Sequence, residues 1–217
     1  MPESPSLFDL AFKDSPDLKL ERNHAASFDG LICGVDEAGR GPWAGPVVTA
    51  AVMLDYRNVP VGLNDSKKLT EARREELFEK ILSGAFVSVA NSSPATIDRL
   101  NIRSATLSAM VRAVNGLAKV PTYVLVDGRD VPPGLRQPGQ ALIKGDGRCL
   151  CVAAASIVAK VTRDRMMVQL EKHFPGYGFA QHKGYGVPQH QVALERLGPC
   201  PHHRISFKPI RLAAEKL

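Results

Sequence analysis

The sequence predicts an α/β domain that carries a basic helical segment on one side. Short apolar runs typical of strands alternate with stretches whose apolar residues recur at helical spacing. Three of the apolar runs end in carboxylates, at Asp36 and Glu37, at Asp127 and at Asp146. The chain has 217 residues, of which 44% are hydrophobic, so it is long enough to bury one full core.

Positive charge is concentrated towards the end of the chain. From residue 156 onward ten Lys and Arg residues face four Asp and Glu residues, an excess of six that equals the formal net charge of +6. Such a surface suits a phosphate backbone, although solubility alone also accounts for a basic excess. The four cysteines lack CxxC spacing and are expected to be reduced. With no membrane-length apolar stretch and no signal peptide, a cytoplasmic protein is expected.

The chain is expected to divide into a tail and one domain. Residues 1–28 mix Pro, Ser, Asp and Lys without sustained periodicity, which predicts a mobile tail. Within it, Leu7 to Leu10 belong to a small apolar stretch that either docks on a partner or, as we favour, lies on the domain. Residues 29–217 are expected to form a single domain, with a helical C-terminal extension from about residue 165.

The first half of the domain has clear helix and strand signals. Residues 31–35 and 47–54 are apolar and close enough along the chain to pair as antiparallel strands. Thr70 is placed to cap a helix that Gly84 terminates. The elements expected after these two strands are a helix over 70–83, a strand over 85–90 and helices over 94–117, interrupted near Asn101.

The second half repeats the pattern of a strand closed by an acid. Residues 123–127 are apolar up to Asp127, and Gly128 follows. A Pro- and Gly-rich stretch over 131–139 predicts a loop. The remaining expected elements are an apolar run over 141–144 before Asp146, a long helix over 151–173 and a short helix over 188–197, with a Pro- and His-rich stretch up to Pro209.

Carboxylates at strand ends predict a metal site. Ligands bind at strand ends in open α/β sheets, so Asp36, Glu37, Asp127 and Asp146 are expected to converge. Four clustered acids repel unless cations neutralise them, and hard oxygen ligands favour Mg²⁺ or Mn²⁺. A pair of such ions about 4 Å apart promotes in-line displacement at phosphorus. A single strand-end Asp is more often a turn former, and Asp146 could instead cap the following helix.

A glycine-rich loop follows the first acidic pair. Its glycines, Gly39, Gly41 and Gly45, do not have the spacing of a dinucleotide fingerprint. The P-loop pattern fails as well, because Arg40 and Gly41 stand where Lys and Ser or Thr are required. Two interpretations remain, which are a tight turn between strands or a backbone that approaches a ligand held at the acidic pair.

Six ordered motifs give the chain its resemblance to a known family. They are Gly34-Val35-Asp36-Glu37-Ala38-Gly39-Arg40-Gly41-Pro42, Asn64-Asp65-Ser66-Lys67-Lys68-Leu69, Val126-Asp127-Gly128, Lys144-Gly145-Asp146, Ala154-Ala155-Ser156-Ile157-Val158-Ala159-Lys160-Val161-Thr162-Arg163-Asp164 and His182-Lys183-Gly184-Tyr185-Gly186. Over about residues 30–210 this set resembles ribonuclease HII, the bacterial type 2 ribonuclease H. The resemblance implies an RNase H-like mixed sheet flanked by helices, with a helical C-terminal extension.

The resemblance also implies an activity and its residues. A metal-dependent endonuclease is expected that hydrolyses the RNA strand of RNA–DNA hybrids and nicks 5′ of ribonucleotides embedded in duplex DNA, leaving 5′-phosphate and 3′-hydroxyl ends. The four acids match the family's ligands for two Mg²⁺ or Mn²⁺ ions. Gly39, Arg40 and Gly41 match the loop that senses the 2′-hydroxyl. Tyr185 matches the aromatic residue that packs on the neighbouring deoxyribose, whereas a partly buried anchor is the plain alternative.

Further cations and a serine are candidates for substrate binding. Ser156 and Lys160 lie one helical turn apart on one face, where a solvated or internally bonded face is the simpler interpretation. Lys183 and Arg204 are the other two candidates. Trp43 in the glycine loop replaces an aliphatic residue usual in the family, which leaves the contacts of the loop open.

Two alternative functions remain to be tested. The sister enzyme ribonuclease HIII adds an N-terminal binding domain, for which the roughly thirty residues before the first strand are too few. A non-catalytic RNA- or hybrid-binding module would use the basic segment, but unneutralised acids would oppose phosphate binding. A monomer is expected.

Overall fold

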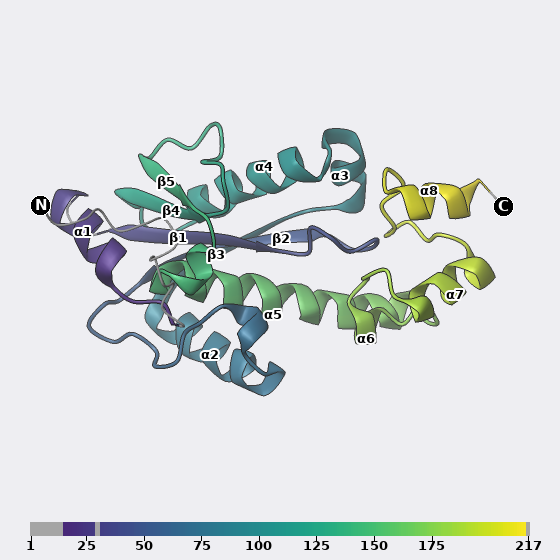
Figure 1. The fold of residues 1–217 in the computed structure, drawn as a ribbon, viewed down its shortest axis with the longest axis horizontal. Coiled ribbons are helices and arrows are strands. Elements are labelled where there is room, and N and C mark those ends of the chain that lie inside the picture. Colours follow the sequence, from purple (N-terminus) through teal and green to yellow (C-terminus); the bar gives the residue numbers. More distant parts are fainter. Residues whose placement is uncertain (1–14, 29–30, 216–217) are drawn as a thin grey trace, which may run out of the picture.

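The computed structural model describes residues 15–28 and 31–215, and there the strands form one mixed sheet with the order β3-β2-β1-β4-β5 (Figure 1). The central strand β1 pairs antiparallel with β2 and parallel with β4, which confirms the antiparallel pairing expected for the first two strands. The strands are β1 (Ile32–Ala38), β2 (Val47–Leu54), β3 (Ala85–Ser92), β4 (Tyr123–Asp127) and β5 (Gly139–Leu142). The α/β class predicted from sequence is confirmed.

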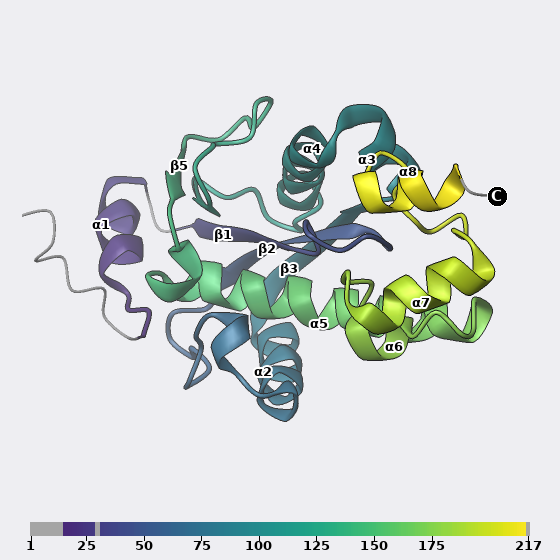
Figure 2. The same ribbon diagram turned by 45° about the vertical axis from the view of Figure 1, so that its right-hand side comes forward.

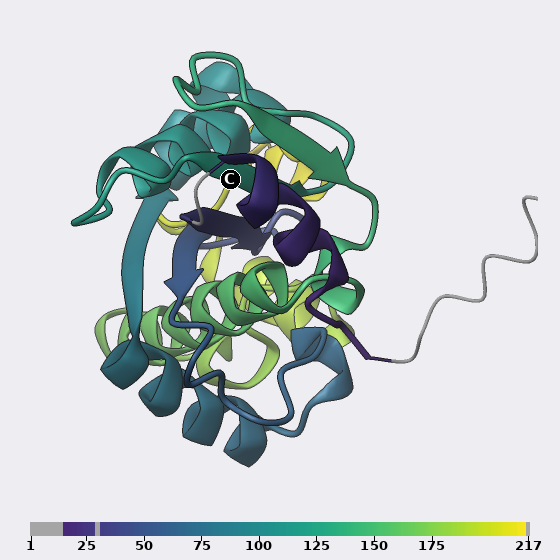
Figure 3. The ribbon, with the colours of Figure 1, turned by 90° about the vertical axis from the view of Figure 1, so that its left-hand side faces the viewer.

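Helices cover both faces of the sheet. The face under α5 and α2 and the face under α4 each hold a buried apolar cluster, and Figure 3 shows the sheet between these two layers. Gly34 lies where α5 crosses β1, and a Cβ atom there would overlap the backbone of Cys151. The helices are α1 (Lys19–Phe28), α2 (Glu71–Gly84), α3 (Pro94–Leu100), α4 (Ile102–Asn115), α5 (Leu150–His173), α6 (Phe179–His182), α7 (Pro188–Leu197) and α8 (Lys208–Ala214).

The C-terminal helices gather beyond one end of the sheet, next to the far end of α5 (Figures 1 and 2). Asp98 of α3 fastens the segment before α8, because its carboxylate accepts hydrogen bonds from the backbone N–H groups of Ile205 and Ser206. Residue 165, the expected start of the extension, lies within α5. The sequence did not predict α6 or α8, which are short and begin in Gly- and Pro-rich stretches.

The N-terminal prediction needs correction. A mobile tail over residues 1–28 is wrong for α1, which lies against the start of α5 at the other end of the molecule (Figure 1). The side chain of Glu21 is buried and accepts a hydrogen bond from the N–H of Cys151 at 3.0 Å, so a residue distant in sequence caps α5. The polar composition of the segment concealed this anchor. Leu7 to Leu10 lie outside the described residues.

Replacing Glu21 by Ala is expected to lower the free energy of unfolding by about 1–2 kcal/mol, the usual cost of removing a helix cap. The α5 helix has no cap from its own Cys149 side chain, so no local group substitutes for Glu21. Urea denaturation measures the change. Glu71→Ala is the control, because Glu71 is exposed in the first turn of α2. Equal stability of the two variants would contradict a capping role.

Within the described residues, no helix combines the length and apolar character needed to cross a membrane.

Candidate active site

Three of the predicted acids meet at the carboxyl ends of two neighbouring parallel strands. Val35 on β1 and Val126 on β4 are partners in the parallel ladder, so Asp36 and Asp127, each one residue further on, lie side by side. Glu37 adds a third carboxylate. One oxygen from each of the three lies within 4.8 Å of the others. The convergence predicted for these acids is therefore confirmed.

The electrostatics of this cluster fit a cation. Burial raises the pKa of Asp36 well above its ordinary value, and the charges of Glu37 and Asp127 raise it further. The pKa values of Glu37 and Asp127 are also raised, in each case chiefly by burial. A divalent cation would relieve this repulsion, and carboxylate oxygens are the donors that Mg²⁺ and Mn²⁺ prefer. The described residues contain no other group of three or more His, Cys, Asp or Glu side chains this close together.

Asp146 lies beside this cluster but outside it. It sits in the single turn Gly145–Gly147 after β5, and its carboxylate accepts a hydrogen bond from the N–H of Gly147. Burial raises its pKa to about 6, with contributions from the charges of Asp127 and Asp65. Cys149 and not Asp146 is the N-cap residue of α5, so the simple capping alternative is wrong.

The raised pKa of Asp146 predicts a pH dependence of stability. Because the folded protein holds this proton more tightly than the unfolded chain, the stabilisation is complete below about pH 4 and is lost as the pH rises through about 6. The melting temperature of metal-free protein should therefore fall between pH 4 and 6.5, and Asp146→Asn should flatten the fall. Added Mg²⁺ should raise the melting temperature more at pH 7.5 than at pH 5, because protons compete for the carboxylates. A profile unchanged by Asp146→Asn would contradict this assignment.

Two buried arginines hold the glycine loop. Arg204 donates hydrogen bonds to the carbonyl oxygens of Gly39, Arg40, Pro42 and Gly45, at distances of 2.6 to 3.0 Å. The sequence-based expectation that Arg204 contacts substrate is corrected, since its side chain is fully buried and occupied by the loop.

Arg163 fastens the same loop from α5. It donates to the carbonyl oxygens of Ala44, Pro46 and Lys183. Gly39 has a φ of +95°, and a Cβ atom there would overlap the side chain of Arg163, so both its conformation and its surroundings require glycine. Neither Arg163 nor Arg204 forms an ion pair with any acid that the structure describes, so their charge adds to the potential behind the loop.

A cavity of about 350 Å³ joins the acids to the loop. Nine of the twelve predicted site residues line it: Asp36, Glu37, Gly39, Arg40, Gly41, Asp127, Ser156, Lys160 and Tyr185. Asp146, Lys183 and Arg204 do not. The Nζ of Lys183 donates to the carbonyl oxygen of Ala180, within its own turn.

The polar contacts of α5 in this cavity are partly internal. Lys160 forms an ion pair with Asp164 at 2.7 Å, and the hydroxyl of Ser156 shares a hydrogen bond with that of Ser66 at 2.9 Å. The internally bonded interpretation therefore holds for these contacts, although both side chains also face the cavity. Sequence reasoning did not single out Ser66 or Lys67 as site residues. Burial lowers the pKa of Lys67, but the surrounding carboxylates outweigh this and raise it.

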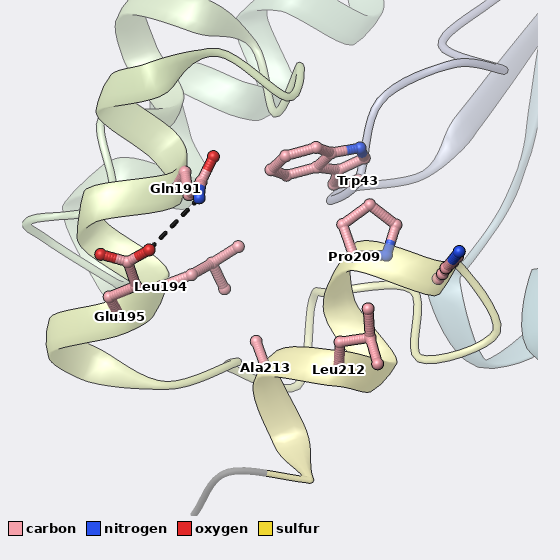
Figure 4. Close-up of a pocket in the computed structure, with 8 residues that line it drawn as sticks. Trp43, Gln191, Leu194, Glu195, Pro209, Leu212 and Ala213 are labelled. Carbon is pink, nitrogen blue, oxygen red and sulfur yellow. Dashed lines mark hydrogen bonds between the residues drawn. The ribbon is translucent and has the colours of Figure 1, made fainter.

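Trp43 lies on the far side of the loop from the acids. Its indole faces a separate, mostly apolar cavity of about 520 Å³ between α7 and α8, lined also by Leu194 and Leu212 (Figure 4). The backbone N–H of Trp43 donates to the carbonyl oxygen of Gly184. A Cβ atom at Gly186 would overlap the indole, so the ring packs directly on that backbone. Trp43 thus anchors the loop to the C-terminal extension and leaves the acid-lined cavity unobstructed.

A mixed sheet with clustered acids at the ends of its central parallel strands, in a basic chain, defines a nuclease of the RNase H-like class. The sequence profile of the Ribonuclease HII family matches residues 33–210. The chain belongs to the ribonuclease HII family. Ribonuclease HII of Rhizobium johnstonii is 57% identical over 210 residues, which cover 97% of this chain and 91% of that protein.

Solved structures agree with this assignment. The crystal structure of ribonuclease H2 from Pyrococcus horikoshii is similar with a TM-score of 0.74 and 32% identity, covering 85% of this chain and 97% of that chain. Bst-RNase HIII in complex with Mn²⁺ has the same fold at 19% identity, with a TM-score of 0.69, and covers 86% of this chain and 70% of that one. The chain is thus an endoribonuclease that cleaves RNA in RNA–DNA hybrids and at embedded ribonucleotides.

Proposed function

We propose that Asp36, Glu37 and Asp127, completed by Asp146, hold two Mg²⁺ or Mn²⁺ ions at which the phosphodiester is hydrolysed. The observation that supports this is the three-carboxylate cluster, whose mutual repulsion a divalent cation would relieve. When bound, such ions activate the attacking water and stabilise the leaving 3′ oxygen. The charge of Asp127 acts on Asp146, which supports Asp146 as the fourth carboxylate of the proposed set.

Recognition of the ribose is assigned to the glycine loop. Gly41 has open space where a Cβ atom would stand, with only the ring of Tyr185 nearby at 3.8 Å, so a sugar can approach the backbone closely. The 2′-hydroxyl is the group that separates RNA from DNA at a given site. Arg40 contributes its charge at the cavity and pairs with Glu37 at 3.3 Å. Its half-exposed guanidinium would exchange this pair for a phosphate on substrate binding.

Tyr185 is assigned to the neighbouring deoxyribose. Its side chain is 46% exposed and lines the cavity with the acids, although a tyrosine beside glycines is often a buried anchor. An exposed ring on the wall of the cavity is suited to packing on a sugar. The cut is then expected 5′ of the ribonucleotide, with 5′-phosphate and 3′-hydroxyl products.

The proposed catalytic unit is one domain over residues 29–217 that acts as a monomer on duplex substrates. Tyr185 comes from the C-terminal extension and Asp36 from the central strand, yet both line one cavity. Arg204 joins the two parts through the loop. Light scattering of the free protein checks the oligomeric state.

The test is a duplex DNA with one embedded ribonucleotide, incubated with the protein and with Mg²⁺, Mn²⁺ or EDTA. We expect a nick 5′ of the ribonucleotide with either metal and no nick with EDTA, because carboxylates without a metal ion cannot stabilise the negative charge on the attacking and leaving oxygens. An all-DNA duplex of the same sequence is the control. Cleavage that persists in EDTA would contradict the metal assignment, and binding without cleavage in every condition would favour a non-catalytic hybrid-binding module.

A further inference from the structure

Two buried histidines stand behind Tyr185 and have no part in the site described above. His190 on α7 is fully buried, and His203 is 2% exposed. Their Nε2 atoms lie 3.0 Å apart, a hydrogen-bond distance that requires one proton between them. His190 also contacts the turn that carries Tyr185, because its Nδ1 lies 2.9 Å from the carbonyl oxygen of Tyr185. A pair of ring nitrogens thus joins α7 to the wall of the active-site cavity.

The neighbouring backbone groups determine which nitrogen carries each proton. The backbone N–H of Cys200 donates to Nδ1 of His203 at 2.9 Å, whereas the carbonyl oxygen of Cys200 lies further from that nitrogen, at 3.3 Å. We therefore assign the proton of neutral His203 to Nε2. That proton can only be donated to Nε2 of His190. The remaining proton of His190 is then on Nδ1, where the acceptor is the carbonyl oxygen of Tyr185. Hydrogen bonds therefore run in one direction from Cys200 to Tyr185.

Both imidazoles are neutral in this arrangement. Burial lowers the pKa of His190. Burial, together with the repulsion that two charged rings would suffer, lowers the pKa of His203 to about 4. The ring of His182 stacks on His190 with centroids 4.5 Å apart and donates from Nε2 to the carbonyl oxygen of Tyr177, while its Nδ1 accepts from Gly184. The turn before Tyr185 is thus supported by a third ring.

We propose that His190 and His203 are positioning residues that set the orientation of Tyr185 towards the nucleotide next to the ribonucleotide. The inference rests on the proposed function, in which Tyr185 packs on the neighbouring deoxyribose. The two histidines would explain how the exposed ring of Tyr185, on a glycine-rich turn, keeps one orientation. Gly184 and Gly186 flank Tyr185 and have no side chains to hold it. The carbonyl oxygen of Tyr185 accepts from the N–H of Val187 within the same turn, and His190 adds the side-chain bond that ties this carbonyl group to the buried side of α7.

The two nitrogens of His190 can be removed separately. An Asn side chain places its amide near the position of Nδ1, and a Gln side chain places its amide near Nε2. His190→Asn therefore retains a donor for the carbonyl of Tyr185 and loses the bond to His203. His190→Gln retains an acceptor for His203 and loses the donor to Tyr185. Val192→Gln, at an exposed position on the same helix, is the control for general effects of substitution.

The measured quantity is the ratio of kcat/KM for a duplex with one ribonucleotide to kcat/KM for a continuous RNA–DNA hybrid. Only the first substrate presents a deoxyribose next to the cut, so a loss of orientation at Tyr185 lowers this ratio, whereas general destabilisation lowers both rates alike. We expect His190→Gln to lower the ratio about 3- to 10-fold, the worth of one hydrogen bond. His190→Asn and Val192→Gln should stay within about 2-fold of the unchanged chain.

A double-mutant cycle tests whether His190 acts through Tyr185. If it does, Tyr185→Ala and Tyr185→Ala/His190→Gln should give the same ratio, because the ring to be positioned is already absent. Additive losses would overturn the proposal. If Tyr185→Ala lowers the ratio and His190→Gln leaves it unchanged, the inference fails while the role of Tyr185 stands. If Tyr185→Ala itself has no effect, the proposed role of Tyr185 fails and the inference fails with it.

Long-range ¹H–¹⁵N NMR spectra of the full chain test the hydrogen bonds without a variant. We expect the Nδ1–H tautomer for His190 and the Nε2–H tautomer for His203. The opposite tautomers, or a charged ring at pH 7, would overturn the proposal. Trp43 is the only tryptophan in the chain, and its ring centroid lies 5.4 Å from that of His190. Its fluorescence therefore shows whether each variant keeps the local fold.

Discussion

Asp127→Asn is expected to abolish cleavage while leaving the protein folded. The carboxylate lies within 4.8 Å of those of Asp36 and Glu37, and the amide that replaces it carries no charge and is a poor cation ligand. We expect kcat to fall by a factor on the order of 10³ or more, as is usual when one member of a catalytic group is removed. Single-turnover cleavage of a duplex with one ribonucleotide measures the loss, because it separates chemistry from product release.

The stability of the metal-free protein should not fall with the activity when Asp127 is replaced by Asn. Burial and neighbouring charge raise the pKa values of the clustered acids, so removing one negative charge relieves repulsion in the metal-free protein. The melting temperature of metal-free Asp127→Asn should therefore equal or exceed that of the unchanged chain. Added Mg²⁺ should raise the melting temperature of the unchanged chain and have much less effect on the variant. Loss of cleavage together with loss of stability would indicate a structural role for Asp127.

Asp130→Asn is the matched control. Asp130 lies three residues further on, after the end of β4, and its carboxylate forms an exposed ion pair with Arg103 at 2.9 Å. Exposed pairs of this kind contribute little to stability. Cleavage by Asp130→Asn should stay close to that of the unchanged chain, so the contrast with Asp127 tests position and not charge alone.

Strand ends were the part of the site that the sequence could predict. An apolar run closed by an acid is a local pattern, and parallel pairing brings the ends of such runs together, as Val35 and Val126 show. Asp146 lies within the turn Gly145–Gly147, whose position depends on a distant contact in which the N–H of Gly145 donates to Asp127, so its exact placement next to the cluster could not be predicted. The position of α1 could not be predicted either, because this polar helix is anchored by the buried carboxylate of Glu21, which accepts from the N–H of the distant Cys151.

Residues whose role depends on burial were predicted least well. A cation in a basic segment is normally exposed, so sequence reasoning assigned Arg204 to the substrate, whereas the structure places it beneath the loop. The direction in which the ring of Trp43 points could not be predicted either, because it depends on where α7 and α8 pack, and these helices line the cavity that the ring faces. The histidine pair has no periodic signal at all, because His190 and His203 meet through the fold of the C-terminal extension.

Arg204→Met is expected to have the second large effect, on both stability and substrate selection. The guanidinium donates to four carbonyl groups of the glycine loop, and the other buried arginine at this loop, Arg163, already donates to different carbonyl groups. Each buried carbonyl left without a donor costs about 1–3 kcal/mol, so we expect the free energy of unfolding to fall by at least about 3 kcal/mol. Arg204→Lys should recover only part of this, since one ammonium cannot serve the same fork of acceptors.

The effect of Arg204 on cleavage follows from the loop that it holds. In the proposed function Gly41 meets the ribose only while the loop backbone keeps its conformation, and Arg204 holds that backbone through the carbonyl oxygens of Gly39 and Arg40. At a temperature where the variant is still folded, we expect the preference for a ribonucleotide-containing duplex to fall about 10-fold or more, with metal-induced stabilisation retained because the acids are not touched. Arg211→Met, at an exposed position on α8, should change neither quantity. If Arg204→Met unfolded no more easily than Arg211→Met and kept full selectivity, the hydrogen bonds to the loop would have no energetic role, and the charge of Arg204 would have to act on the substrate directly.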